Sequence, residues 1–181
     1  SRLDLFDHYV YRNRLLSQRR PSTDQPLRIL NVGGGTGLET AMLARDLADR
    51  KLQGSIVHVD ISEASIELAT QLVSGLGLEQ VVTFVASPLE LFLAERFRFD
   101  DAAAVIAVAP HKFDLILCTG VLHHLDDPMG ALGLLRDALA PGGGILLAVY
   151  GRHGRHGVYE MQEALRLALP TGEALDDHER L

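Results

Sequence analysis

Short apolar runs alternate with longer amphipathic stretches along most of the chain. Five of these runs are nearly continuous in apolar residues, which is typical of parallel strands that are buried on both faces. Helices between the runs would provide the crossovers, so the pattern predicts an α/β fold with a doubly wound parallel sheet. The strands are expected at Arg28–Val32, Ser55–Asp60, Val81–Ala86, Phe113–Cys118 and Gly144–Tyr150.

Capping residues mark where the first two helices should begin. Thr36 and Glu39 have the spacing of a capping box, which predicts a helix from there to about Arg50. Ser62 is placed to cap the helix that follows the second strand.

A third helix is predicted between the fourth and fifth strands. Asp127 followed by Pro128 is a typical helix start, with an N-cap residue before a proline in the first helical position. The apolar stripe is expected to run to Leu139, and Pro141–Gly143 is expected to end the helix before the last strand.

Composition excludes several classes of protein. The chain has 181 residues, of which 47% are hydrophobic and 23% charged, so a disordered tail, a collagen-like rod and a disulfide scaffold are excluded. The longest apolar run, Ala102–Pro110, is too short to span a bilayer, and no membrane partner is expected. The single cysteine, Cys118, favours a reducing, cytoplasmic setting. A net charge of −7 argues against binding to duplex DNA.

Local composition divides the chain into three parts. Residues 1–26 are expected to form a basic helical segment and linker, and residues 27–150 the core with the sheet. Residues 151–181 are expected to form a basic loop and a helix in which Val158, Met161 and Leu165 share one face.

A glycine-rich turn between the first strand and its helix is the strongest functional motif. Gly33, Gly34, Gly35 and Gly37 follow Val32, and such a turn lets a ligand approach the backbone closely. The dinucleotide fingerprint G-x-G-x-x-G fails, because its third glycine would fall on Leu38. The spacing is G-x-G-x-G, which disfavours a nicotinamide-dependent oxidoreductase.

An acidic residue ends the second strand. A carboxylate at that place can accept hydrogen bonds from both hydroxyls of a ribose, and this role is predicted for Asp60. The alternative is that Asp60 only caps the next helix, but Ser62 is better placed to do so.

Two further motifs complete a resemblance to a known family. Phe113–Pro128 resembles the fourth strand and following loop of the class I S-adenosylmethionine-dependent methyltransferases, and Leu139–Leu147 resembles their turn into strand five. Together with the glycine turn and Asp60, these motifs follow the order and spacing of that family over residues 28–150. The likeness is to bacterial enzymes that act on small molecules.

The resemblance implies a set of cofactor-binding residues. S-Adenosylmethionine would be bound by the glycine turn and Asp60, and the family's pattern adds Ile61, Ser87 and Thr119. Two positions depart from the pattern: Asn31 stands where the family usually has an acid, and Ser87 stands where it often has an aspartate near the adenine.

Two adjacent histidines follow strand four, where the family's substrate pocket opens. His123 or His124 could act as a general base toward an oxygen or nitrogen nucleophile. A positioning or packing role remains the alternative. Metal binding is not expected, because His153 and His156 lie far along the chain and complete no recognised ligand set.

The sequence therefore predicts methyl transfer from S-adenosylmethionine to a small-molecule acceptor. The alternative is a catalytically silent domain of the same fold that binds the cofactor or a partner. No strand pair is visible after Tyr150, so the sheet is expected to stop at strand five with the order 3-2-1-4-5. The exposed edge of strand five is expected to be covered by a missing C-terminal region or by a second copy in a homodimer.

Overall fold

The computed structural model of the protein describes residues 26–96, 112–151 and 153–168. The chain divides into two compact units between Val149 and Tyr150. The predicted basic segment before residue 26 and the run Ala102–Ala109 lie outside the described residues.

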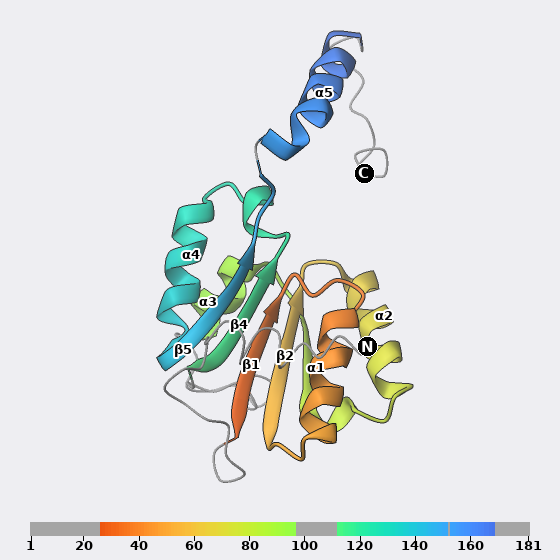
Figure 1. Ribbon diagram of the computed structural model, residues 1–181, viewed down its shortest axis with the longest axis vertical. Helices are drawn as coiled ribbons and strands as arrows, with labels where there is room; N and C mark the ends of the chain where they lie inside the picture. The colour runs from red at the N-terminus through yellow and green to blue at the C-terminus, as the bar shows by residue number, and fades with distance from the viewer. Residues whose placement is uncertain (1–25, 97–111, 152, 169–181) are drawn as a thin grey trace. The chain divides into compact units, whose positions relative to one another are not determined.

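The first unit is built on a five-stranded sheet in which every neighbouring pair is parallel (Figure 1). The strand order is β3-β2-β1-β4-β5, so the predicted fold class and order are confirmed. The strands are β1 Leu27–Val32, β2 Gly54–Asp60, β3 Val82–Ala86, β4 Phe113–Thr119 and β5 Leu139–Ala148.

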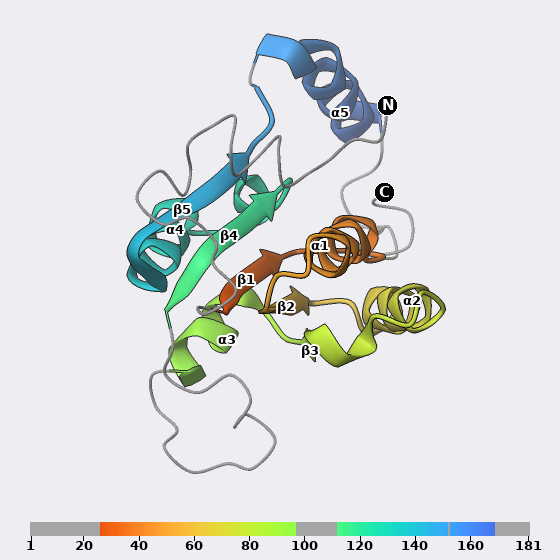
Figure 2. The same cartoon turned by 60° about the horizontal axis from the view of Figure 1, so that its bottom comes forward.

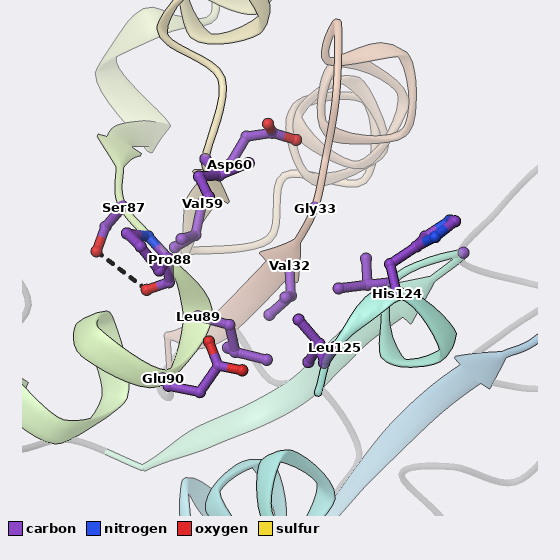
Figure 3. A pocket seen from close by; sticks show the side chains of 13 residues that line it. Val32, Gly33, Val59, Asp60, Ser87, Pro88, Leu89, Glu90, His124 and Leu125 are labelled. Carbon is purple, nitrogen blue, oxygen red and sulfur yellow. Dashed lines mark hydrogen bonds between the residues drawn. The ribbon is translucent and has the colours of Figure 1, made fainter. Parts of the chain in front are cut away.

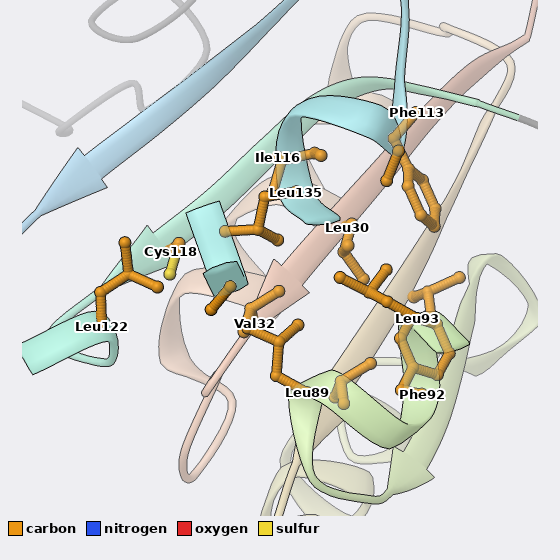
Figure 4. Close-up of a cluster of buried hydrophobic side chains, with 14 residues drawn as sticks. Leu30, Val32, Leu89, Phe92, Leu93, Phe113, Ile116, Cys118, Leu122 and Leu135 are labelled. Carbon is orange, nitrogen blue, oxygen red and sulfur yellow. The ribbon is translucent and has the colours of Figure 1, made fainter. Parts of the chain in front are cut away.

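Helices cover both faces of the sheet (Figures 1 and 2). Along β1 the side chains alternate: Leu27 and Ile29 pack in one apolar cluster with α1, and Leu30 and Val32 pack in another with α3 and α4 (Figure 4). Burial on both faces explains why the strand is mainly apolar, with Arg28 and Asn31 as its two polar residues. The helices are α1 Leu38–Asp49, α2 Glu63–Ser74, α3 Leu89–Arg96 and α4 Pro128–Asp137.

The helix starts agree with the sequence in two cases out of three. The side chain of Ser62 accepts the N–H of Ser65 at 3.2 Å, and that of Asp127 accepts the N–H of Gly130 at 2.9 Å, as predicted. The predicted capping box at Thr36 is wrong. The N-cap of α1 is Gly37, whose φ of 87° is left-handed and which makes no side-chain cap bond.

The fifth strand starts earlier than predicted. Helix α4 ends at Asp137, and β5 begins at Leu139 rather than at Gly144. The pairing with β4 jumps from Phe113↔Leu139 to Leu115↔Gly144, so the segment with Pro141 forms a bulge within the strand. Within the described residues β5 pairs only with β4, which leaves its other edge open.

The second unit contains helix α5, His156–Ala168. The guanidinium carbon of Arg155 lies 3.9 Å from the ring centroid of Tyr150, just before this helix. The predicted apolar face is present as a stripe that remains exposed, for example at Val158 and Met161. No helix in the described ranges is both long and apolar enough to cross a membrane.

Candidate cofactor-binding site

The candidate site lies where the strand order reverses. Strand β1 has β2 on one side and β4 on the other, and consecutive crossovers leave this point in opposite directions. In open parallel sheets such a switch point holds the ligand crevice at the carboxyl ends of the strands. The glycine turn after Val32 and the loop after Thr119 both begin there.

The carboxylate of Asp60 joins the glycine turn to the next crossover. Its Oδ2 accepts the N–H of Gly35 at 2.8 Å, and its Oδ1 accepts the N–H of Ser62 at 2.9 Å. Each carboxylate oxygen has a second acceptor position, so Asp60 can still accept a hydrogen bond from a ligand hydroxyl. The carboxylate thus holds the backbone of the loop by hydrogen bonds and can still accept one from a ligand such as a ribose.

The turn itself needs glycine for two different reasons. Gly33 has a φ of +60°, and an added Cβ would lie 2.2 Å from Cγ2 of Val121, so both backbone and space exclude a side chain. Gly35 has a φ of +54°, but an added Cβ would meet nothing within 4 Å. The backbone of Gly35 therefore borders open space, as a cradle for a ligand requires.

A cavity of about 380 Å³ opens beside the first glycine of this turn. This volume lies within the usual range for small-molecule pockets. Ser87, Pro88 and Glu90 line it on the β3–α3 side, and His124 and Leu125 line it on the β4–α4 side (Figure 3).

The cavity collects about half of the predicted site residues. Its lining includes these five: Gly33, Asp60, Ile61, Ser87 and His124. The side chain of Ile61 is 74% exposed and offers an apolar surface next to the Asp60 carboxylate. Gly34, Gly35 and Gly37 belong to the adjoining turn and do not line the cavity.

Thr119 is near the site but faces a different partner. Its hydroxyl donates to the Glu39 carboxylate at 3.2 Å, which ties the end of β4 to the first turn of α1. Glu39 is thus used in this contact rather than in the capping box that its spacing had indicated. Neither residue lines the cavity.

The two histidines after β4 have different surroundings. They belong to a short 3₁₀ helix, Leu122–His124, and their ring centroids are 4.1 Å apart. His124 is exposed and lines the cavity, whereas both ring nitrogens of His123 are shielded from solvent. Of the pair, His124 is therefore the residue with access to a ligand.

A buried polar chain beneath the glycine turn is the main feature that sequence reasoning missed. The amide nitrogen of Asn31 donates to Oγ1 of Thr40 at 3.0 Å, and Thr40 Oγ1 lies 2.8 Å from Nδ1 of His58. All three residues are completely buried. The available signal was a polar residue inside each of two apolar strands, at Asn31 and His58.

The described residues offer neither a metal-binding cluster nor a reactive thiol. No cluster of three or more His, Cys, Asp or Glu side chains is placed there to hold a metal ion. Cys118 is fully buried, and burial raises the pKa of its thiol to about 11, so the thiolate is disfavoured at neutral pH.

Comparison with known families assigns the chain to a class. Residues 30–145 match the methyltransferase domain family, and the chain belongs to that family. The expected resemblance to class I S-adenosylmethionine-dependent methyltransferases is thereby confirmed.

Similar proteins come from bacteria. An uncharacterized protein of Synechococcus sp. is 34% identical over 94% of this chain and 36% of its own length. The malonyl-[acyl-carrier protein] O-methyltransferase of Halalkalibacterium halodurans is 27% identical over 91% of this chain and 53% of its own length. The chain thus spans between a third and about half of these relatives.

A solved structure shares the fold. The plantazolicin methyltransferase BpumL in complex with S-adenosylhomocysteine aligns with a TM-score of 0.56 and 19% identity. The alignment covers 86% of this chain and 49% of that one.

The buried imidazole of His58 predicts a dependence of stability on pH. Burial lowers the pKa of His58 below its usual value of 6.5, against the opposing effects of the Asp60 charge and the Gly35 backbone. The unfolded chain then binds this proton more readily than the folded chain, so the free energy of unfolding decreases as the pH falls below about 6.5. The loss should be visible between pH 6.5 and 5.5, where the unfolded chain takes up this proton and the folded chain resists it.

Urea unfolding of the wild-type protein and the His58→Gln variant across this range measures the contribution. The variant should lose less stability on acidification than the wild-type protein. A His156→Gln control, in which the exposed histidine of α5 is replaced, should retain the wild-type dependence. Parallel curves for wild type and His58→Gln would contradict the assignment.

Proposed function

We propose that the protein transfers a methyl group from S-adenosylmethionine to a small-molecule acceptor. The observation that carries this proposal is the junction of a G-x-G-x-G turn with Asp60 at the edge of one cavity. Membership of the methyltransferase domain family supports the same reaction.

The residues present fit a nucleoside with an amino-acid tail. Asp60 would accept the ribose hydroxyls, and the exposed side chain of Ile61 would contact one face of the base. The hydroxyl of Ser87 already donates to the Pro88 carbonyl at 3.0 Å, which leaves its oxygen as an acceptor for an amino group. The backbone of Gly33–Gly37 would hold the tail, with Thr119 behind it at the end of β4.

The protein's contribution to the reaction is mainly alignment. The cofactor supplies a methyl group on a positively charged sulfur, which is already a good leaving group. The chain must hold the acceptor in line with that bond and exclude water from it. Alignment of this kind lowers barriers by roughly 7–11 kcal/mol in well-oriented intramolecular reactions. Methyl transfer therefore requires neither a catalytic triad nor paired carboxylates.

The histidines after β4 are the candidate proton acceptors. We assign the role of general base to His124, which is exposed and lines the cavity, and a supporting role to His123. A neutral imidazole can remove the proton of a hydroxyl or amine acceptor as the methyl group is transferred.

The acceptor is best described by class. The relatives include an enzyme named for malonyl-[acyl-carrier protein], whose methylated group is an oxygen. A small acceptor with an ionisable oxygen is compatible with an exposed imidazole at the cavity. A catalytically silent domain is the alternative, and it would bind the cofactor without any turnover.

Binding of S-adenosylhomocysteine tests the cofactor assignment. Calorimetry should detect binding to the wild-type protein, and Asp60→Ala should weaken it about tenfold or more because a charged acceptor and the anchor of the turn are both lost. NAD and NADP serve as controls and should bind no better than background. Unchanged affinity in Asp60→Ala, or micromolar binding of either dinucleotide, would contradict the assignment.

A substitution at His124 tests the proposed base. His124→Ala should lower the rate of methyl transfer to an oxygen or nitrogen acceptor by about a hundredfold, the usual contribution of a positioned base. Affinity for S-adenosylhomocysteine should change little. An acceptor screen with the wild-type protein must come first, and undiminished turnover in the variant would leave His124 with a packing role.

The open edge of β5 predicts a further contact. Leu147, on β5, is 41% exposed, and an unpaired apolar edge invites pairing with another strand. We propose that this edge is covered by a second copy or by further chain of a longer protein. Light scattering combined with the activity assay measures this, and a 181-residue chain that is monomeric and fully active would overturn the proposal.

A further inference from the structure

The polar chain under the glycine turn has a defined direction. The amide nitrogen of Asn31 can only donate, so Oγ1 of Thr40 is the acceptor in the bond between them. The single hydroxyl proton of Thr40 is then directed to Nδ1 of His58, 2.8 Å away. An Nδ1 that accepts a hydrogen bond carries no proton, so the neutral ring carries its proton on Nε2.

The second ring nitrogen lies under the cofactor turn. Nε2 of His58 is buried and makes no hydrogen bond of standard geometry within the described residues. The backbone of Gly35 raises the pKa of His58, against the larger lowering that burial causes. The N–H of the same Gly35 donates to Asp60.

The imidazole is also in close contact with the turn. A Cβ added at Gly34 would lie 2.4 Å from Cε1 of His58, so the ring fills the space directly beneath this residue. The ring of Phe84 on β3 lies 5.3 Å away, centroid to centroid, on another side. The turn therefore rests on a side chain that its neighbours hold in place.

We propose that His58, fixed as the Nε2–H tautomer by Thr40, is a positioning residue that sets the conformation of the glycine turn for the cofactor. Asn31 completes the arrangement because its amide group leaves the hydroxyl proton of Thr40 free for His58. This role rests on the proposed function, since it concerns the same cofactor. It adds residues that have no direct contact with the cavity.

Nuclear magnetic resonance of the full chain with ¹⁵N-labelled histidine tests the first half of the proposal. At pH 7 the spectrum should show His58 with an unprotonated Nδ1 and a protonated Nε2. Thr40→Val, which removes the hydroxyl at nearly constant volume, should shift the amide signals of Gly33–Gly37. A wild-type Nδ1–H tautomer, or unchanged glycine signals in Thr40→Val, would overturn the proposal.

Affinity for S-adenosylhomocysteine tests the second half. Thr40→Val should weaken binding roughly three- to tenfold, the range expected for one lost hydrogen bond. Thr70→Val is the matched control, because the hydroxyl of Thr70 donates to the Ile66 carbonyl on the exposed side of α2. The control should bind like the wild-type protein, and equal affinities of all three proteins would overturn the proposal.

A pair of substitutions separates positioning from space filling. His58→Phe keeps a ring of similar size without nitrogen atoms, and His58→Gln restores a donor near the place of Nε2. Gln should bind S-adenosylhomocysteine at least about threefold more tightly than Phe. Equal affinities would show that the ring only fills space. If the wild-type protein bound no S-adenosylhomocysteine, the proposed function would fail, while the tautomer and the glycine signals would still decide the role of His58.

Discussion

The hydrogen bond between the Gly35 N–H and Asp60 is the contact on which the site depends. It joins the turn after β1 to the end of β2, and the same carboxylate accepts the N–H of Ser62 at the start of α2. One side chain therefore fixes two of the segments that lie at the cavity. A backbone N–H that loses its hydrogen-bond partner in a partly buried position costs free energy. Movement of either segment away from Asp60 is therefore unfavourable.

The parallel sheet determines where this contact can form. Its central strands are buried on both faces, so the ends of β1, β2 and β4 are held in register by ladders on either side. Crossovers that depart in opposite directions from β1 leave an opening at the carboxyl edge. The core therefore supplies rigidity, and the loops supply the groups that face a ligand.

Sequence patterns predicted the parts of the fold that depend on local chemistry. Apolar runs located all five strands, and the caps at Ser62 and Asp127 were found because each acts on a backbone N–H three residues away. The capping box failed because Glu39 has a partner 80 residues away, at Thr119. The early part of β5 was missed because its Pro–Gly segment has the composition of a turn, and only its pairing with β4 makes it a bulged strand. Long-range contacts of this kind leave no periodic trace in the sequence.

Asn31, which stands where the family resemblance leads us to expect an acid, also takes part in long-range contacts. A carboxylate there would have no proton to donate to Thr40, and would instead accept the threonine hydroxyl that His58 now receives. His58 would then have to present an N–H to Thr40 and would face an additional buried negative charge. With asparagine the chain of donors is neutral and points toward His58, which suits an imidazole whose pKa is lowered by burial. Asn31, Thr40 and His58 therefore form one neutral hydrogen-bonded chain beneath the glycine turn, without a buried charge at position 31.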